Sequence, residues 1–159
     1  MSDYSIRLAT AEDAETVFNL VKRLAEYERL AHEVISSPET FRQVLARPNS
    51  TVEVLLAESD GEAVGFALFF ENFSTFLGRP GLYLEDLFVL PEMRRRGIAT
   101  ALFERLFQIA RDKNYGRVEW TVLDWNTPAI EFYTQKLKAR LLEEWRVCRV
   151  VMGNDGRVK

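Results

Sequence analysis

The chain of 159 residues contains one cysteine, Cys148, and one histidine, His32. A lone cysteine cannot form an internal disulfide, and this supply of soft ligands argues against a structural zinc and against a Cys–His nucleophile pair. The alternating pattern WRVCRVVM around Cys148 predicts a small buried hydrophobe in a strand. We therefore expect neither thiol catalysis nor metal chemistry.

The sequence also lacks an excess of positive charge and a long apolar run. Lys and Arg number 21 against 24 Asp and Glu, a net charge of −3, so no global field favours a polyanion and we expect no nucleic-acid partner. The N-terminus MSDYSIRLATAED carries charges and hydroxyls where a signal peptide needs an apolar core. With no stretch approaching the length that spans a bilayer, we expect a cytoplasmic protein without membrane contact.

Hydrophobic residues make up 47% of the chain, which is enough for one core, and we predict a single domain over residues 1–159. Alternating and helical periodicities predict a strand, two helices, a hairpin, a strand, a helix, a strand, a helix and a final strand. Their ranges are 4–9, 10–28, 37–47, 51–59 with 62–72, 82–90, 98–114, 117–123, 128–137 and 146–152, with a loop over 73–81. This order predicts an α/β domain with a mixed sheet.

The segment VLPEMRRRGIATALF, residues 89–103, places three arginines before Gly97 and Ala99, where a strand pattern gives way to a helix. The start of a helix presents unpaired N–H groups and a partial positive charge, which favours phosphate binding. A glycine there permits a close approach of ligand oxygens. The context predicts a pyrophosphate cradle, while these residues alone fit a solvated basic turn equally well.

The pattern Arg94-x-x-Gly97-x-Ala99 after YLEDLFVLPEM resembles the acetyl-CoA motif of the GCN5-related N-acetyltransferases (GNAT), and the order of elements is similar to that family throughout. The stretches IRLATAED, LAEYE, LYLEDLFV, RRRGIATALF, WNTPAIEFY and EEWR resemble its diamine (spermidine/spermine-type) and thialysine N-acetyltransferase branch. The resemblance implies one GNAT domain with a mixed central sheet of about six or seven strands flanked by about four helices. It also implies acetyl-CoA as cosubstrate, no metal, and a homodimer.

The resemblance also implies a cofactor site. Strand residues would bind the pantetheine arm through their backbone, the arginine-rich turn would hold the pyrophosphate, and the WNTP segment would contact the cofactor arm. The implied positions are Leu87, Phe88, Val89, Arg94, Arg95, Arg96, Gly97, Ile98, Ala99, Thr100, Asn126, Thr127, Pro128 and Ala129. Tyr133 matches the tyrosine near the thioester sulfur and would protonate it as it leaves, although helix periodicity alone favours a core aromatic.

Acetyl transfer to an amine requires a neutral nitrogen, whereas a lysine-like ammonium has a pKa of about 10.4. Carboxylates can both attract the cation and accept its proton. Glu85 and Asp86 are adjacent on a predicted strand, so we expect them to point to opposite faces, and the resemblance selects Glu85 for the amine, leaving Asp86 a supporting role. The implied substrate-binding residues are Tyr27, Glu28, Glu85, Glu119, Trp120, Thr121 and Glu143.

These residues predict direct attack in a ternary complex by the amine of a diamine, a polyamine or a lysine-like amino acid such as thialysine, with an N–H near Phe88 or Val89 stabilising the oxyanion. Two positions depart from the family: Leu137 replaces a glycine that often ends the last helix, and Ser74 replaces an aspartate of polyamine-specific members. The second departure favours a shorter diamine or an amino acid at least as well as a polyamine. Acetylation of a protein N-terminus or an aminoglycoside, and a non-catalytic acyl-CoA sensor, are the alternatives.

Overall fold

The computed structural model describes residues 3–159. The chain forms two compact units, the first ending at Thr121 and the second running over Val122–Lys159, and each is described by itself. Within the described residues, no helix combines the length and the apolar character needed to cross a membrane.

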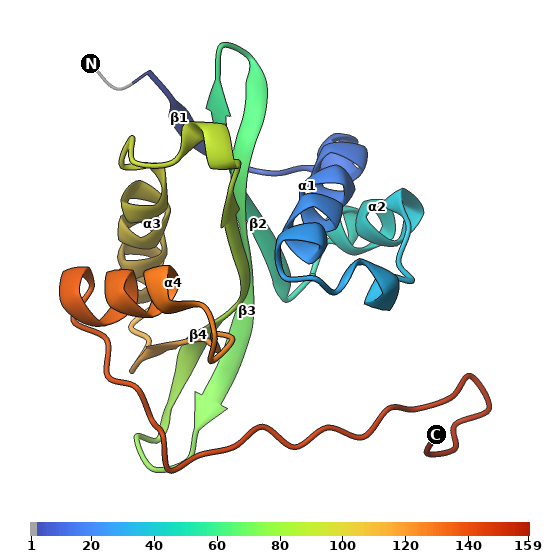
Figure 1. Cartoon of the computed structure of the whole chain (residues 1–159). Coiled ribbons are helices and arrows are strands. Elements are labelled where there is room, and N and C mark those ends of the chain that lie inside the picture. The colour runs from blue at the N-terminus through green and yellow to red at the C-terminus, as the bar shows by residue number, and fades with distance from the viewer. Residues whose placement is uncertain (1–2) are drawn as a thin grey trace. The chain divides into compact units, whose positions relative to one another are not determined.

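The first unit is built on a mixed five-stranded sheet with strand order β1-β2-β3-β4-β5 (Figure 1). Strands β1 to β4 pair antiparallel with their neighbours, and β5 pairs parallel with β4. Their bounds are Ser5–Leu8, Val52–Ser59, Glu62–Ser74, Arg79–Val89 and Val118–Glu119. The predicted α/β class with a mixed sheet is confirmed.

The two hairpins differ in how well the sequence predicted them. Strands β2 and β3 meet at Asp60 and Gly61, both with positive φ, as the predicted two-residue turn requires. The predicted loop over 73–81 is wrong, because Ser74 pairs with Arg79 and the turn shrinks to residues 75–78. Pro80 is tolerated in β4: Leu82, two residues on, donates its N–H toward β5, so the proline nitrogen also faces away from β3.

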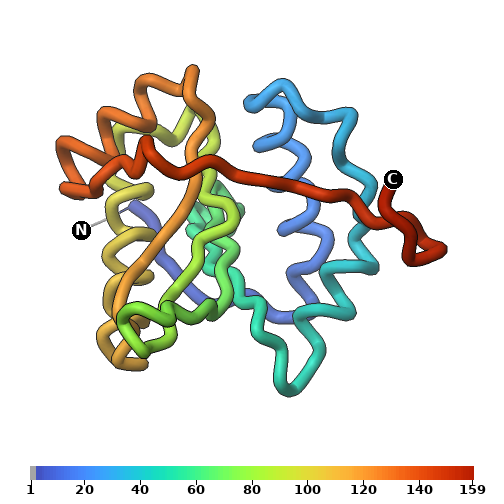
Figure 2. The backbone as a smooth tube through the Cα atoms, turned by 90° about the horizontal axis from the view of Figure 1, so that it is seen from below, coloured from blue at the N-terminus to red at the C-terminus, as the bar shows by residue number. Residues whose placement is uncertain are grey.

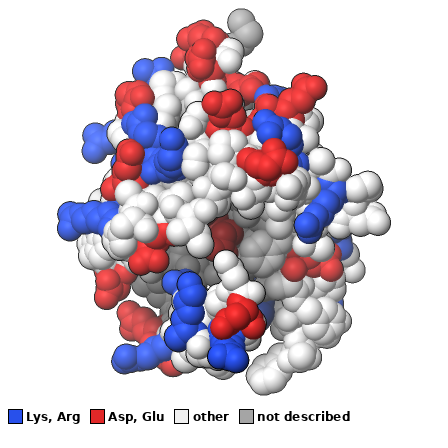
Figure 3. Space-filling model, turned by 90° about the vertical axis from the view of Figure 1, so that its right-hand side faces the viewer, with Lys and Arg blue, Asp and Glu red and all other residues white. Residues whose placement is uncertain are grey.

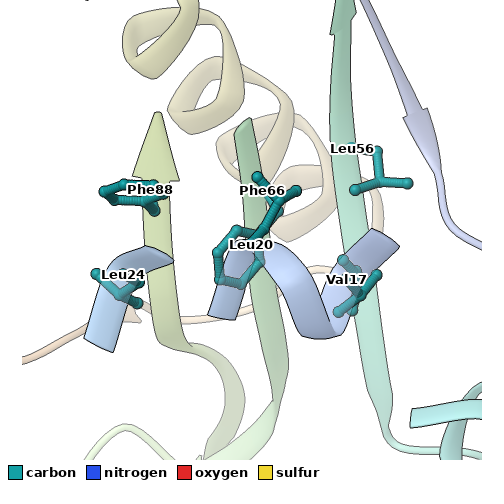
Figure 4. Close-up of a cluster of buried hydrophobic side chains, with 7 residues drawn as sticks. Val17, Leu20, Leu24, Leu56, Phe66 and Phe88 are labelled. Atoms are coloured by element: carbon teal, nitrogen blue, oxygen red, sulfur yellow. The ribbon is translucent and has the colours of Figure 1, made fainter. Parts of the chain in front are cut away.

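Helices cover both faces of this sheet, with α1 (Ala14–Tyr27) and α2 (Pro38–Ala46) on one and α3 (Ile98–Asp112) on the other (Figure 1). Both helices on that face begin with capping residues: Thr10 and Asp13 form a capping box before α1, and Ser37 caps α2 ahead of Pro38. The apolar side of α1 faces the sheet. Val17, Leu20 and Leu24 pack there against Val54, Leu56, Phe66 and Phe88 (Figure 4).

This burial fixes the C-terminal end of α1 beside β4. Each fully buried side chain of this kind contributes about 1.5–3 kcal/mol, and Leu24 lies one turn from the end of the helix. Tyr27 packs its ring 6.2 Å from that of Phe88 on β4. The last residues of α1 are therefore held at the strand that carries the candidate site.

In the second unit, α4 (Thr127–Glu131) continues into a π-helical turn over Phe132–Lys136. Asn126 is the N-cap, and its side-chain oxygen accepts a hydrogen bond from the N–H of Ala129. Leu137 stands where the family often has a glycine, and the next residue, Lys138, has a φ of 59°. The N–H of Ala139 donates to the carbonyl of Tyr133 at 2.9 Å. A non-glycine residue thus takes the left-handed position at this helix exit.

The predicted final strand over 146–152 does not form. The tail is extended (Figure 2), and its one strand-type pairing among the described residues is an isolated bridge between Met152 and Val158. Cys148 is exposed, which contradicts its predicted burial. The strand predicted over 117–123 forms only over Val118–Glu119. Because the final strand is absent, the described sheet has five strands instead of six or seven. An alternating apolar and polar pattern indicates a segment that is able to form a strand, but a strand also needs a free sheet edge with which to form hydrogen bonds.

Candidate active site

Strand β4 contains a β-bulge at the two adjacent acids. Asp86 pairs with Leu68 and Leu84 pairs with Phe69, so Glu85 is an extra residue without a counterpart on β3. The register places Asp86 on the same face of the sheet as Phe88, which packs under α1. Leu84 is buried but is not part of the cluster under α1, so it faces the other side of the sheet. Because side chains alternate along a strand, the next residue, Glu85, also points to the face under α1. The expectation that the two acids point to opposite faces is therefore wrong.

Three carboxylates gather on this face: Glu85 and Asp86 from β4, and Glu28 from the C-cap of α1. Burial, followed by the negative charges of Glu85 and Glu28, raises the pKa of Asp86 to about 7. Burial also raises the pKa of Glu28, while Glu85 is exposed. Such a cluster attracts a cation, and Asp86 exchanges a proton near neutral pH. Sequence reasoning did not place Asp86 on this face beside Glu85, because it treated β4 as a regular strand.

Beyond the bulge, the backbone of β4 offers hydrogen-bonding groups on its outer side. The N–H of Leu90 donates to the carbonyl of Val64, so antiparallel alternation turns Phe88 toward β3, and Leu87 and Val89 away from it. Strand β5 pairs with β4 at Leu82 and Tyr83 only. An extended acyl-carrying arm can thus pair with Leu87 and Val89, whereas the N–H of Phe88 faces the β3 ladder.

The cradle forms at the start of α3. Gly97 is its N-cap with φ of 82°, the first turn contains no acidic residue, and no side chain of the described residues caps it. Arg95 also has positive φ, at 62°, a conformation that costs a non-glycine residue about 1–2 kcal/mol. Strain of this kind, which the sequence does not reveal, is typical of ligand-binding turns. The N–H groups of this helix start suit a phosphate.

Gly97→Ala is expected to weaken acetyl-CoA binding severalfold and to destabilise the protein by about 1 kcal/mol, because alanine is strained at this φ. The added methyl group itself has room, since its nearest neighbour would be the Tyr4 hydroxyl at 3.6 Å. Calorimetric titration with acetyl-CoA and thermal unfolding measure the two effects. Gly61→Ala, at the β2–β3 turn, is the control: it should be similarly destabilised with unchanged acetyl-CoA affinity.

The side chains of Arg94, Arg95 and Arg96 lie in different surroundings. Arg94 turns back toward α1: its Nε donates to the carbonyl of Val89 at 3.1 Å, and its guanidinium lies 4.6 Å from the ring centroid of Tyr27. Arg95 and Arg96 are exposed at the turn. Their side chains are therefore placed to add charge beside the cradle, while that of Arg94 joins the turn to α1.

The remaining predicted substrate residues of the first unit lie around β5. The ring of Trp120 is 5.0 Å from that of Phe103 on α3, which places Trp120 against the face of the sheet opposite the acidic cluster. Glu119 pairs with Arg117 at 3.8 Å, and Thr121 is exposed. The structure does not bring Trp120 together with the carboxylates.

In the second unit, one helix carries most of the predicted residues. Asn126, Thr127, Pro128 and Ala129 form its first turn, and the half-buried Tyr133 lies on the π-helical turn that follows. The ring of Tyr133 is 5.7 Å from that of Phe132. Glu143 lies separately, exposed on the extended tail.

Comparison with known proteins places this arrangement in a family. Residues 16–138 match the acetyltransferase (GNAT) family, and the chain therefore belongs to it and is an acetyl-CoA-dependent N-acetyltransferase. It is similar to a thialysine N-epsilon-acetyltransferase of Caenorhabditis elegans, with 36% identity over 84% of this chain and 81% of the relative. An L-ornithine N5-acetyltransferase of Arabidopsis thaliana is 30% identical over 91% of this chain and 83% of the relative.

Solved structures agree on the fold. An integron cassette protein of Vibrio cholerae superimposes with a TM-score of 0.76 and 26% identity, covering 97% of this chain and 94% of the other. An aminoglycoside acetyltransferase from a soil metagenome superimposes with a TM-score of 0.74, covering 92% of this chain and 98% of the other, but at 20% identity it shows the fold alone.

Proposed function

We propose that this acetyltransferase modifies the primary amine of a small cationic substrate, either a short diamine or a lysine-like amino acid such as thialysine or ornithine. The observation that carries the proposal is the group of Glu28, Glu85 and Asp86 on one face of the sheet, beside the outward backbone groups of Leu87 and Val89. The relatives named for thialysine and ornithine support it, because both substrates carry a side-chain amine.

Glu85 receives the ammonium and Asp86 accepts its proton, directly or through water. With an ordinary carboxyl, the donor and acceptor pKa values would differ by about 6.5. The pKa of about 7 at Asp86 narrows that difference to roughly 3.4, which lowers the cost of proton transfer by roughly 4 kcal/mol. The bulge thereby supplies both a cation site and a base of suitable strength.

The neutral nitrogen then attacks the thioester carbonyl, the new C–N bond forms, and the C–S bond breaks. The N–H of Val89 stabilises the oxyanion, because Phe88 directs its own N–H to β3. The thiolate leaves as CoA and takes a proton from the hydroxyl of Tyr133. The attacking nitrogen loses its second proton as the amide forms, and this proton returns through water to the tyrosine. Both substrates are bound at once, and no acyl-enzyme forms. We propose that both units of the chain form one domain for this reaction, as the family match over residues 16–138 supports.

A short substrate is favoured over a long polyamine by the position of Ser74. This residue is buried, and its hydroxyl accepts from the N–H of Leu77 at 3.2 Å in the β3–β4 turn. It therefore stabilises the turn and supplies no anion for a second ammonium.

We further propose a homodimer with no nucleic-acid partner. The tail that resembles a strand exposes Trp145, Val147 and Val150 at 74%, 71% and 64%, an apolar segment suited to a second copy. On the face drawn in Figure 3, basic and acidic side chains are interspersed, which does not favour a polyanion. Sedimentation at several concentrations tests the dimer, and a monomer throughout would contradict it.

The proposed substrate class is tested by CoA-thiol release with a panel of thialysine, ornithine, lysine, putrescine, cadaverine, spermidine, an aminoglycoside and a peptide N-terminus. We expect the highest kcat/KM with the amino acids or short diamines. Turnover confined to the aminoglycoside or the peptide would replace the proposal with those activities. Absence of turnover with every amine, together with tight acetyl-CoA binding, would support the sensor alternative.

Glu85→Gln is expected to raise the KM for the amine about tenfold and leave acetyl-CoA affinity unchanged, because the variant keeps the shape of the side chain and removes one exposed negative charge. Steady-state kinetics with each substrate varied in turn measure both constants. Glu62→Gln, an exposed acid at the start of β3, is the matched control. An unchanged amine KM in Glu85→Gln would remove Glu85 from the cation site.

A further inference from the structure

Arg94 occupies a position that phosphate binding does not explain. Its guanidinium lies 4.6 Å from the ring centroid of Tyr27 and 5.6 Å from that of Phe88, and these two rings are 6.2 Å apart. Its Nε donates to the carbonyl of Val89 at 3.1 Å. One side chain thus contacts the end of α1, the core of β4 and the outer edge of β4.

These contacts join the two halves of the reaction site in the first unit. Tyr27 is the last residue of α1 and precedes Glu28 of the acidic cluster. Val89 carries the outward N–H to which we assign the oxyanion, and Arg94 begins the proposed cradle that ends at Thr100. A conformational change in the turn before α3 therefore reaches the end of α1 through the guanidinium of Arg94.

We infer that Arg94 is a positioning residue that couples amine binding to acetyl-CoA binding. Occupation of the cradle orders the turn that carries Arg94, and its guanidinium then holds Tyr27 and Glu28 in place for the ammonium. The inference rests on the proposed function for the location of the amine site. Thermodynamic linkage requires the coupling to be reciprocal, so the amine must tighten CoA binding by the factor with which CoA tightens amine binding.

The chemistry of the contact predicts which substitutions preserve it. A guanidinium combines a flat face that stacks on aromatic rings with an Nε–H at fixed geometry, and an ammonium provides neither in that form. Arg94→Lys should therefore lose most of the coupling, as Arg94→Met does. On the other side of the contact, Tyr27→Phe keeps the ring and should keep the coupling, whereas Tyr27→Leu should lose it.

The coupling can be measured without turnover. Calorimetric titration gives the Kd of CoA, the non-reactive product, with and without a saturating amine chosen from the active members of the panel. We expect the amine to lower the Kd of CoA about tenfold in the wild type and in Tyr27→Phe, and less than about twofold in Arg94→Met, Arg94→Lys and Tyr27→Leu. Arg105→Met, an exposed arginine on α3, is the matched control and should retain the full factor.

Three results would overturn the inference. The first is a wild-type coupling factor near one. The second is a full coupling factor in Arg94→Met together with a CoA affinity that falls about tenfold or more, which would make Arg94 a phosphate ligand. The third is additivity of Arg94→Met and Tyr27→Leu in urea unfolding, because residues in contact should show non-additive effects. This double-mutant comparison by urea unfolding needs no substrate. It therefore tests the contact between Arg94 and Tyr27 even if no amine of the panel is acetylated and the proposed function is wrong.

Discussion

Asp86→Asn is expected to lower kcat by about 100-fold or more, because general bases contribute about 10²–10⁴ to rate and asparagine cannot accept the proton. The amine panel member with the highest kcat/KM is the substrate to use. In the wild type, kcat/KM should rise with pH through the pKa of about 7, as Asp86 becomes ionised. In the variant, the inflection near pH 7 should disappear. A retained inflection, or wild-type kcat, would assign the proton to another group.

The same substitution should stabilise the protein at alkaline pH. The folded state holds the proton of Asp86 up to about pH 7, and the unfolded chain releases it near the ordinary value of 3.8. Between these values the folded state binds more protons, so the stability contributed by this group falls as pH rises from about 4 to 7. The full cost at pH 8 is roughly 4 kcal/mol, and asparagine avoids it.

Urea unfolding at pH 5 and pH 8 measures this effect. The stability advantage of Asp86→Asn over the wild type should widen by roughly 3 kcal/mol between the two conditions. Glu104→Gln, an exposed acid on α3, is the control and should show the same difference from the wild type at both pH values. An advantage of Asp86→Asn that does not depend on pH would mean that the carboxyl titrates normally in the folded state.

Tyr133→Phe is expected to reduce kcat by about 100-fold while the Kd of acetyl-CoA stays within about twofold of the wild type. The tyrosine protonates the departing sulfur. Because a thiol has a pKa of about 8.5, thiolate is a tolerable leaving group even without a proton, so the expected loss of kcat is at the low end of the range for an acid catalyst. The ring itself is half-buried next to Phe132, and phenylalanine retains that contact.

Rapid-quench measurement of the chemical step, with calorimetric titration of acetyl-CoA, separates chemistry from binding for this variant. Tyr115→Phe is the control, since it removes a phenol that donates to Glu71 at 2.6 Å outside the proposed site. Its turnover should stay within about twofold of the wild type. Unchanged turnover in Tyr133→Phe would remove this residue from the acid role, and a loss of acetyl-CoA binding would make it a cofactor contact.

The features that the sequence predicted correctly depend on neighbouring residues. The helix predicted over 10–28, the two-residue turn between 51–59 and 62–72, and the helix start at residue 98 all follow from a few adjacent side chains. These features were sufficient for the fold class. The cradle stays a prediction, which rests on the local backbone N–H groups at the start of α3.

The features that it missed depend on partners far along the chain. The bulge at Glu85 exists only in the register of β4 with β3, and the stacking of Arg94 exists only because α1 packs its end beside β4. The tail around Cys148 has the alternation of a strand without a ladder. None of these partners can be identified from spacing in one sequence.

The bulge also limits how this protein can change its substrate during evolution. Side chains alternate along a strand, so the extra residue at Glu85 shifts the phase of everything that follows it in β4. Loss of that residue would turn Phe88 out of the core under α1, and another insertion nearby would do the same. New specificities at this strand must therefore arise by exchange of the side chains at positions 85 and 86, since a change in length would dismantle the core.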